Sequence, residues 1–96
     1  MIVPMNLSDF EKIKTKLNSD FDDFWNANLL KDELLKENRR YIVYKQDDEI
    51  LGFGGITIIL DEAELMNIVV CKDKRNQGIG HELLQKLIEI CKNERN

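Results

Sequence analysis

Hydrophobic residues change their spacing from segment to segment along this chain, and that spacing predicts the secondary structure. Alternating apolar positions rich in Val, Ile and Tyr are typical of strands, whereas apolar residues three or four apart predict an amphipathic helix. The chain is accordingly expected to contain a strand over 1–5, helices over 9–18 and 27–38, strands over 41–44, 50–60 and 63–70, and a helix from 78 to about 93. This order, β-α-α-β-β-β-α, predicts an α+β (mixed α/β) fold with a mostly antiparallel sheet flanked by helices.

The sequence predicts a buried face for each of the three helices and an N-cap for the first. Ser8 or Asp9 is expected to N-cap the first helix, because their side-chain oxygens can accept from free backbone N–H groups. The expected buried faces are Phe10, Ile13 and Leu17 in the first helix, Leu30, Leu34 and Leu35 in the second, and Leu83, Leu84, Leu87, Ile88 and Cys91 in the third. The acidic and aromatic stretch 20–28, which includes Phe24 and Trp25, is expected to be a loop or the start of the second helix.

Three glycines interrupt the strand predicted over 50–60. Gly52, Gly54 and Gly55 lack the side chains that normally pack on a sheet, so they indicate a bulge or a close approach of another segment.

Composition excludes several classes of protein. The 96 residues are 43% hydrophobic and 33% charged, which is typical of one small globular domain. No apolar stretch approaches the roughly 20 residues that a membrane span needs, and the first residues do not resemble a signal peptide. Cys71 and Cys91 lie 20 residues apart, with no second cysteine pair and no histidine beside either, so we expect neither a metal site nor a disulfide, and a reduced, cytoplasmic setting.

The charge is unevenly distributed. The net charge is -4, yet the last 25 residues carry six basic and four acidic side chains. An acidic chain is a poor candidate for nucleic-acid binding, which depends on phosphate neutralisation. A small basic zone in an acidic domain is better suited to one compact anionic ligand.

The most informative segment lies between the last predicted strand and the last predicted helix. Lys72, Lys74 and Arg75 are followed by Gly78 and Gly80, where the helix is expected to begin. Free N–H groups and the helix dipole at such a point bind phosphate, and glycines allow a phosphate to approach the backbone. A P-loop is excluded because no Gly-Lys-Ser or Gly-Lys-Thr occurs, and a Rossmann motif because position 83 is a leucine.

The pattern Arg75-x-x-Gly78-x-Gly80 resembles the acetyl-CoA signature of the GCN5-related N-acetyltransferases (GNAT). Further similarity over 50–53 and 60–70 resembles the bacterial ribosomal-protein alanine N-acetyltransferase branch. The resemblance implies that the strand residues Ile68, Val69 and Val70 pair with the pantetheine arm of acetyl-CoA. It further implies that the pyrophosphate lies on the amides of Arg75, Asn76, Gln77, Gly78, Ile79 and Gly80.

The resemblance covers only the first two thirds of that family's fold. A complete member continues with a fifth strand that carries a glutamate base and a fourth helix that carries a tyrosine acid. Residues 1–96 are therefore expected to form a single incomplete GNAT domain that lacks these C-terminal strands and helix. Glu64 is the candidate base, since the histone-acetylating branch has its base at the matching position, and burial there would favour a base. The alternative is an outward-facing strand residue.

The expected function is acetyl transfer from acetyl-CoA to the N-terminus of a protein, of the ribosomal-protein alanine type. Two alternatives remain open: a catalytically inactive CoA-binding domain and a structural fragment of such an enzyme. The expected partners are acetyl-CoA and a peptide or protein N-terminus, without nucleic acid or membrane. Self-association is also expected, through the edge of the strand over 63–70, because unpaired apolar edges attract other strands.

Overall fold

Four strands form one antiparallel sheet in the computed structural model, which describes residues 1–21, 26–60 and 62–94. The strands lie in chain order as β1 (Ile2–Pro4), β2 (Arg39–Gln46), β3 (Glu49–Ile59) and β4 (Glu62–Val70). The helices are α1 (Leu7–Ile13), α2 (Ala27–Leu35) and α3 (Ile79–Glu94), with a π-helical turn over Leu17–Phe21 and a 3-10 turn over Lys72–Lys74. The predicted element order and the mixed α/β class are confirmed.

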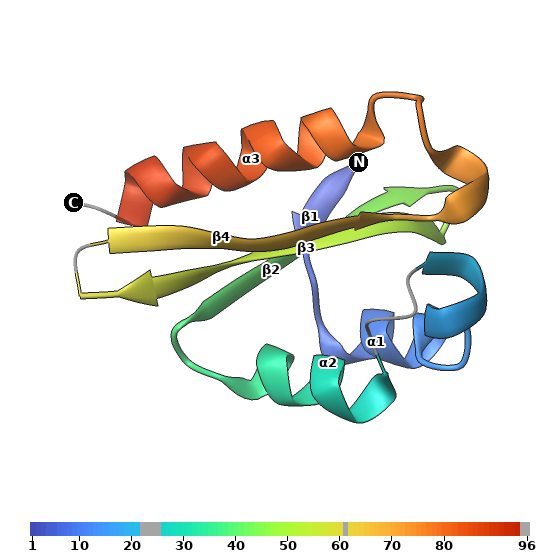
Figure 1. Ribbon diagram of the computed structural model, residues 1–96, viewed down its shortest axis with the longest axis horizontal. Helices are drawn as coiled ribbons and strands as arrows, with labels where there is room; N and C mark the ends of the chain where they lie inside the picture. Colours follow the sequence, from blue (N-terminus) through green and yellow to red (C-terminus); the bar gives the residue numbers. More distant parts are fainter. Residues whose placement is uncertain (22–25, 61, 95–96) are drawn as a thin grey trace.

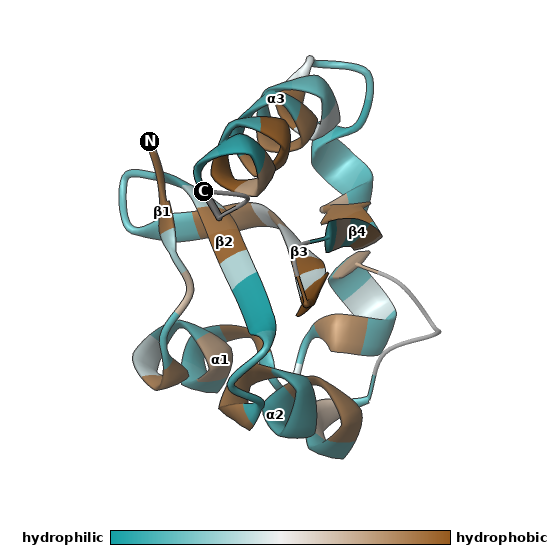
Figure 2. Ribbon diagram, turned by 90° about the vertical axis from the view of Figure 1, so that its left-hand side faces the viewer, coloured by the Kyte–Doolittle hydropathy of each residue, from teal (hydrophilic) through white to brown (hydrophobic). Residues whose placement is uncertain are grey.

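Helices cover both faces of the sheet. Helix α3 lies on one face, whereas α1 and α2 lie on the other (Figure 1). Hydrophobic segments of α3 and of the strands face one another between the helix and the sheet (Figure 2). None of the described helices combines the length and the apolarity needed to cross a membrane.

Two hydrophobic clusters follow from this arrangement, because successive strand residues point to opposite faces. The cluster beside α1 and α2 consists of Phe10, Ile13, Leu17, Phe21, Leu30, Tyr41, Val43, Ile50, Phe53 and Val69. The cluster beneath α3 consists of Ile42, Leu51, Ile56, Ile79, Leu83 and Leu87. Burial of these side chains on both sides makes the sheet the central layer of the protein.

Helix α1 begins two residues earlier than predicted and ends earlier. Its N-cap is Asn6, so the prediction of Ser8 or Asp9 as the cap is wrong. Asn6 Oδ1 accepts from the Asp9 N–H at 2.8 Å, while Asp9 Oδ2 accepts from the Asn6 N–H at 3.0 Å. This reciprocal pair satisfies two donors and is more favourable than either single cap. Asp9 Oδ1 also lies 2.6 Å from Lys45 Nζ, which ties the helix to β2.

Two predicted helix faces need correction. Leu35 is 61% exposed at the last position of α2, where the helix ends and the chain becomes extended at Lys36. Ile88 is 40% exposed, since α3 packs through Ile79, Leu83 and Leu87, which follow one another every four residues.

The glycines of β3 lie where other segments approach closely, as predicted. A Cβ built on Gly54 would lie 3.1 Å from Leu87 Cδ1 of α3. A Cβ built on Gly55 would lie 2.6 to 2.7 Å from the ring of Tyr41, on the opposite face. The β3–β4 register also shifts between Gly55 and Ile56, which leaves Met66 as the extra residue of a bulge.

We predict that Gly55→Ala destabilises the fold by about 1–3 kcal/mol, because the new methyl group must displace the Tyr41 ring from a packed core. Gly80→Ala is the matched control, since the nearest atom to its Cβ would be Val70 Cγ2 at 3.5 Å, an ordinary contact. Urea denaturation of the two variants measures the difference. A Gly55→Ala protein as stable as the wild type would contradict the close packing of Tyr41 on Gly55.

Candidate functional site

The loop between β4 and α3 occupies one end of the sheet (Figure 1). After Val70 the chain makes the 3-10 turn over Lys72–Lys74 and then reaches α3 through residues 75–78. The structure therefore brings together the strand residues 68–70 and the loop residues 75–80 that the sequence singled out. Asn76, Gln77 and Gly78 are exposed, so the loop faces solvent.

Gly78 and Gly80 have different structural roles. Gly78 has φ +85°, a left-handed conformation that strongly favours glycine, and a Cβ there would have no heavy atom within 4 Å. Gly80 lies against β4, where its Cβ would contact Val70 and Ile68. The first glycine thus leaves an open space at the start of α3, and the second allows α3 to pack on the strand.

The start of α3 offers backbone donors to this open space. The first bond of the helix joins the Glu82 N–H to the Gly78 carbonyl at 3.0 Å. Among the described residues, no acceptor contacts the N–H groups of Ile79, Gly80 or His81. The 16-residue helix also places partial positive charge at this end. The geometry fits an anion such as a phosphate.

Arg75 does not extend freely into solvent. Its Nη2 donates to the carbonyl of Phe21 at 2.9 Å, and its Nε donates to the carbonyl of Val70 at 3.3 Å. Lys72 Nζ donates to the carbonyl of Asn18 at 3.4 Å. These bonds attach the loop to the π-helical turn over 17–21, a role that sequence reasoning did not assign to Arg75.

The predicted pantetheine-facing residues lie on the outermost strand of the sheet. Val69 is buried in the cluster beside α1 and α2, whereas Ile68 and Val70 pack toward α3. Within the described part of the chain, β4 pairs only with β3, so its other edge offers free backbone groups. Leu65 and Met66 are exposed on this strand, at 52% and 42%.

Glu64 lies on β4 opposite Thr57 and is exposed to solvent. The burial that would favour a base at this position is absent, and the structure agrees with the alternative of an outward-facing strand residue. About 13 Å of strand separates Glu64 from Ile68, so the carboxylate is removed from the loop. The described residues contain no group of His, Cys, Asp and Glu side chains that could hold a metal ion. Phe24 and Trp25 lie outside the described residues.

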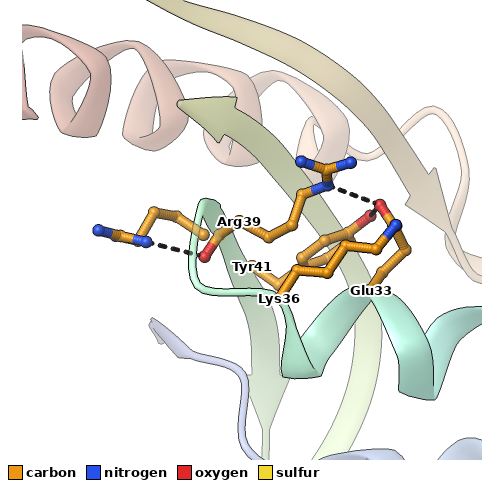
Figure 3. A network of polar contacts seen from close by, with 5 residues as sticks. Glu33, Lys36, Arg39 and Tyr41 are labelled. Atoms are coloured by element: carbon orange, nitrogen blue, oxygen red, sulfur yellow. Dashed lines mark hydrogen bonds and ion pairs between the residues drawn. The ribbon is translucent and has the colours of Figure 1, made fainter. Parts of the chain in front are cut away.

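A buried ionic network lies where the chain passes from the end of α2 into β2 (Figure 3). It was not predicted from the sequence. Glu33 Oε2 accepts from Lys36 Nζ at 2.7 Å, and Oε1 accepts from Arg39 Nε at 3.0 Å and from the Tyr41 hydroxyl at 3.3 Å. Glu33 and Tyr41 are 8% and 6% exposed. Lys36 directly follows α2, and Arg39 and Tyr41 lie on β2, so the turn from α2 into β2 brings these partners to Glu33.

The network changes the acidity of both buried groups. Burial alone would raise the pKa of Glu33, but the hydrogen bonds and charges of Lys36 and Arg39 outweigh it and hold the pKa below its usual 4.5. Burial, reinforced by the Glu33 charge, raises the pKa of Tyr41 to about 12, although a side-chain hydrogen bond from Asn67 acts in the opposite direction. Tyr41 therefore stays protonated, with Glu33 as a carboxylate.

Comparison with known proteins places this geometry in context. The model of the acetyltransferase (GNAT) family matches residues 5–96. A Bacillus subtilis (strain 168) protein, provisionally named a ribosomal protein bS18-alanine N-acetyltransferase, is 30% identical over 89 residues, which are 92% of this chain and 59% of that protein. The ribosomal protein bS18-alanine N-acetyltransferase of Escherichia coli (strain K12) is 36% identical over 55 residues, 55% of this chain and 37% of the relative. The chain thus spans less than two thirds of these relatives.

Solved structures show the same fold. The crystal structure of the Escherichia coli ribosomal-protein-S18-alanine N-acetyltransferase has a TM-score of 0.83 at 24% identity, covering 97% of this chain and 59% of that one. An aminoglycoside 6'-N-acetyltransferase complexed with coenzyme A has a TM-score of 0.80 at 19% identity, covering 98% of this chain and 56% of that one.

We predict that Glu33→Gln lowers the free energy of unfolding by about 1–3 kcal/mol at pH 7, because charge-assisted hydrogen bonds are lost. Since the Glu33 pKa is depressed in the folded state, its stabilisation is present above the usual 4.5 and is lost as pH falls through the folded-state pKa. The difference in free energy of unfolding between the variant and the wild type should therefore shrink as the pH falls below the folded-state pKa of Glu33. Glu11→Gln, which removes an exposed partner of Lys14, is the control and should change stability little. A Glu33→Gln deficit that is constant down to pH 3 would contradict this assignment.

Proposed function

Because this chain belongs to the acetyltransferase (GNAT) family, we propose that it binds acetyl-CoA and contributes to acetyl transfer onto the α-amine of a protein N-terminus, of the ribosomal-protein alanine type. The observation that carries this proposal is the glycine-containing start of α3, where an open space meets free backbone donors. The names of the relatives from Bacillus subtilis and Escherichia coli support the choice of acceptor.

The fit of CoA to this end of the sheet depends on the backbone rather than on charge alone. In the proposal, the pyrophosphate accepts from the N–H groups of residues 75–80, with Gly78 leaving room for its oxygens. The free edge of β4 at Ile68–Val70 offers backbone partners to the pantetheine amides. Coenzyme A in the aminoglycoside acetyltransferase structure supports this class of ligand.

The proposed reaction is a direct transfer. The acceptor amine attacks the thioester carbonyl, the carbon–sulfur bond breaks, and CoA leaves as a thiolate that takes up a proton. The amine loses one proton, which a carboxylate on β4 could accept. Glu64 is the candidate for this role, and its exposure favours a second candidate function in which the chain binds CoA without catalysing transfer.

Two further expectations from the sequence stay part of this proposal. The exposed Leu65 and Met66 on the free edge of β4 support self-association through that strand. A cytoplasmic location agrees with acetyl-CoA as the co-substrate.

We predict that Gly78→Val weakens CoA binding at least about tenfold, because the branched side chain fills the open space and cannot adopt φ +85° without strain. Asp48→Val is the matched control, since Asp48 has φ +69° in the β2–β3 turn, away from the loop. Isothermal titration with CoA measures both variants. If the wild type binds CoA and Gly78→Val binds it equally well, the phosphate site is not at Gly78. No binding by the wild type would contradict the proposed function.

We also predict that Glu64→Gln lowers the rate of acetyl transfer to an alanine-initiated peptide about 10²-fold, if Glu64 accepts the amine proton. Glu62→Gln, on the same strand and also exposed, should leave the rate unchanged. Release of free CoA thiol measures the rate. An undiminished rate in Glu64→Gln would remove Glu64 from the mechanism, and CoA binding without turnover in the wild type would favour the non-catalytic alternative.

A further inference from the structure

The loop that leads into α3 has a backbone that needs support. Asn76 has φ +67° and Gly78 has φ +85°, so both residues are left-handed. For a residue other than glycine this conformation is unfavourable, and it persists where the surrounding structure holds it. Residues 75–78 are exposed, so little packing supports them. Hydrogen bonds to the rest of the protein are the main remaining support.

The side chain of Arg75 supplies such bonds. Its Nη2 donates to the Phe21 carbonyl at 2.9 Å, and its Nε donates to the Val70 carbonyl at 3.3 Å. The planar guanidinium holds its N–H groups in a fixed fork, so two bonds of this kind also set the direction of the side chain. Arg75 directly precedes Asn76, so the two bonds fix the residue from which the left-handed part of the loop starts.

Both acceptor carbonyls are themselves held in place. Val70 ends β4, and the next N–H, that of Cys71, donates to the Leu51 carbonyl of β3 at 2.8 Å. Phe21 is 2% exposed, and its ring centre lies 5.7 Å from that of Phe53, also on β3. Through both carbonyls Arg75 therefore connects the exposed loop to the same buried strand.

The bonds of Arg75 argue against a direct role of its charge at the phosphate. An arginine that binds phosphate directs its fork of N–H groups at the phosphate oxygens. Here Nε and Nη2 are bonded to two carbonyls of the protein, whereas the open space beside Gly78 meets backbone N–H groups of α3. A carbonyl needs a donor rather than a positive charge, so a neutral side chain with an N–H group can take over part of this role.

We propose that the Arg75 side chain is a positioning residue for CoA. It donates to the carbonyls of Phe21 and Val70 and thereby fixes the backbone of residues 76–80, with its N–H groups directed at the pyrophosphate. This inference rests on the proposed binding of CoA. It adds to that proposal a role for the Arg75 side chain that does not depend on its charge.

Two neutral variants of similar length separate the donor from the charge. Glutamine has its amide nitrogen at the position of arginine Nε, so Arg75→Gln can keep the bond to Val70, whereas Arg75→Met has no donor. Calorimetric titration of the intact 96-residue chain with CoA is expected to show Arg75→Met at least about tenfold weaker than the wild type. Arg75→Gln is expected to bind at least about threefold more tightly than Arg75→Met. Lys74→Met, which removes a charge from the neighbouring position, is the control and should stay within about threefold of the wild type.

Salt gives a second measure of the same difference. Added salt screens a charge that acts on a phosphate, so a charge role predicts that the loss in Arg75→Met shrinks severalfold as NaCl rises from about 0.05 M to about 0.5 M. A positioning role predicts that the ratio of wild-type to variant affinity stays constant within about twofold. Equal affinities of Arg75→Gln and Arg75→Met, or a ratio that falls with salt, would overturn the proposal.

The mobility of the loop separates positioning from a general structural role. Nitrogen-15 relaxation of the ligand-free protein is expected to show larger ps–ns motion at Asn76 and Gly78 in Arg75→Met, with partial recovery in Arg75→Gln. Gly54, in β3, is expected to be unchanged, and so is the thermal unfolding midpoint. An unchanged loop in Arg75→Met would overturn the proposal, as would an equal change at Gly54.

The titrations also separate this inference from the proposed function. A wild type that does not bind CoA would contradict the proposed function itself. A wild type that binds CoA, with Arg75→Met binding it equally well, would leave the proposed function intact and remove the Arg75 side chain from it.

Discussion

The structure depends on the burial of most of β3, one of the two inner strands of the sheet, on both of its faces. Residues 50–57 are buried without interruption, so neither face can be left to solvent. One face must therefore receive α3 and the other the side chains beside α1 and α2. Glycine at 54 and 55 allows each layer to approach the backbone, one through Leu87 and one through the Tyr41 ring. This packing fixes the position of α3 on the sheet. It thereby also fixes the position of the loop between β4 and α3 that contains Gly78.

The same packing explains which parts of the fold could be predicted. Strands and the last helix carry their periodicity in neighbouring residues, so their order and class follow from the sequence. The start of α1 does not, because Ser8, Asp9 and Asn6 are all competent caps and only the reciprocal bond of Asn6 with Asp9 decides among them. Ile88 fits the apolar stripe of α3 but is exposed, since the helix packs on the sheet through Ile79, Leu83 and Leu87.

For the candidate site, too, the features set by neighbouring residues could be predicted, and those set by folding could not. The Arg75-x-x-Gly78-x-Gly80 pattern is local, so the sequence alone locates an anion-binding loop. The partners of Arg75 are not local: the Phe21 carbonyl is 54 residues away in the chain. Glu33, Arg39 and Tyr41 are also brought together only by folding. The one available signal for the Glu33 network was Asn67, whose side chain hydrogen-bonds to Tyr41. It is a polar residue between Met66 and Ile68, in a strand that is otherwise apolar at that point.

The attachment of the loop to the π-helical turn over 17–21 has a thermodynamic consequence. Arg75 and Lys72 donate to carbonyls of this turn, those of Phe21 and Asn18. Opening of the turn therefore breaks the bonds that orient the loop, and opening of the loop exposes the carbonyls of the turn. We therefore expect the two segments to open and close together. By linkage, a ligand that binds only the closed loop also shifts the opening equilibrium of a turn that it does not contact.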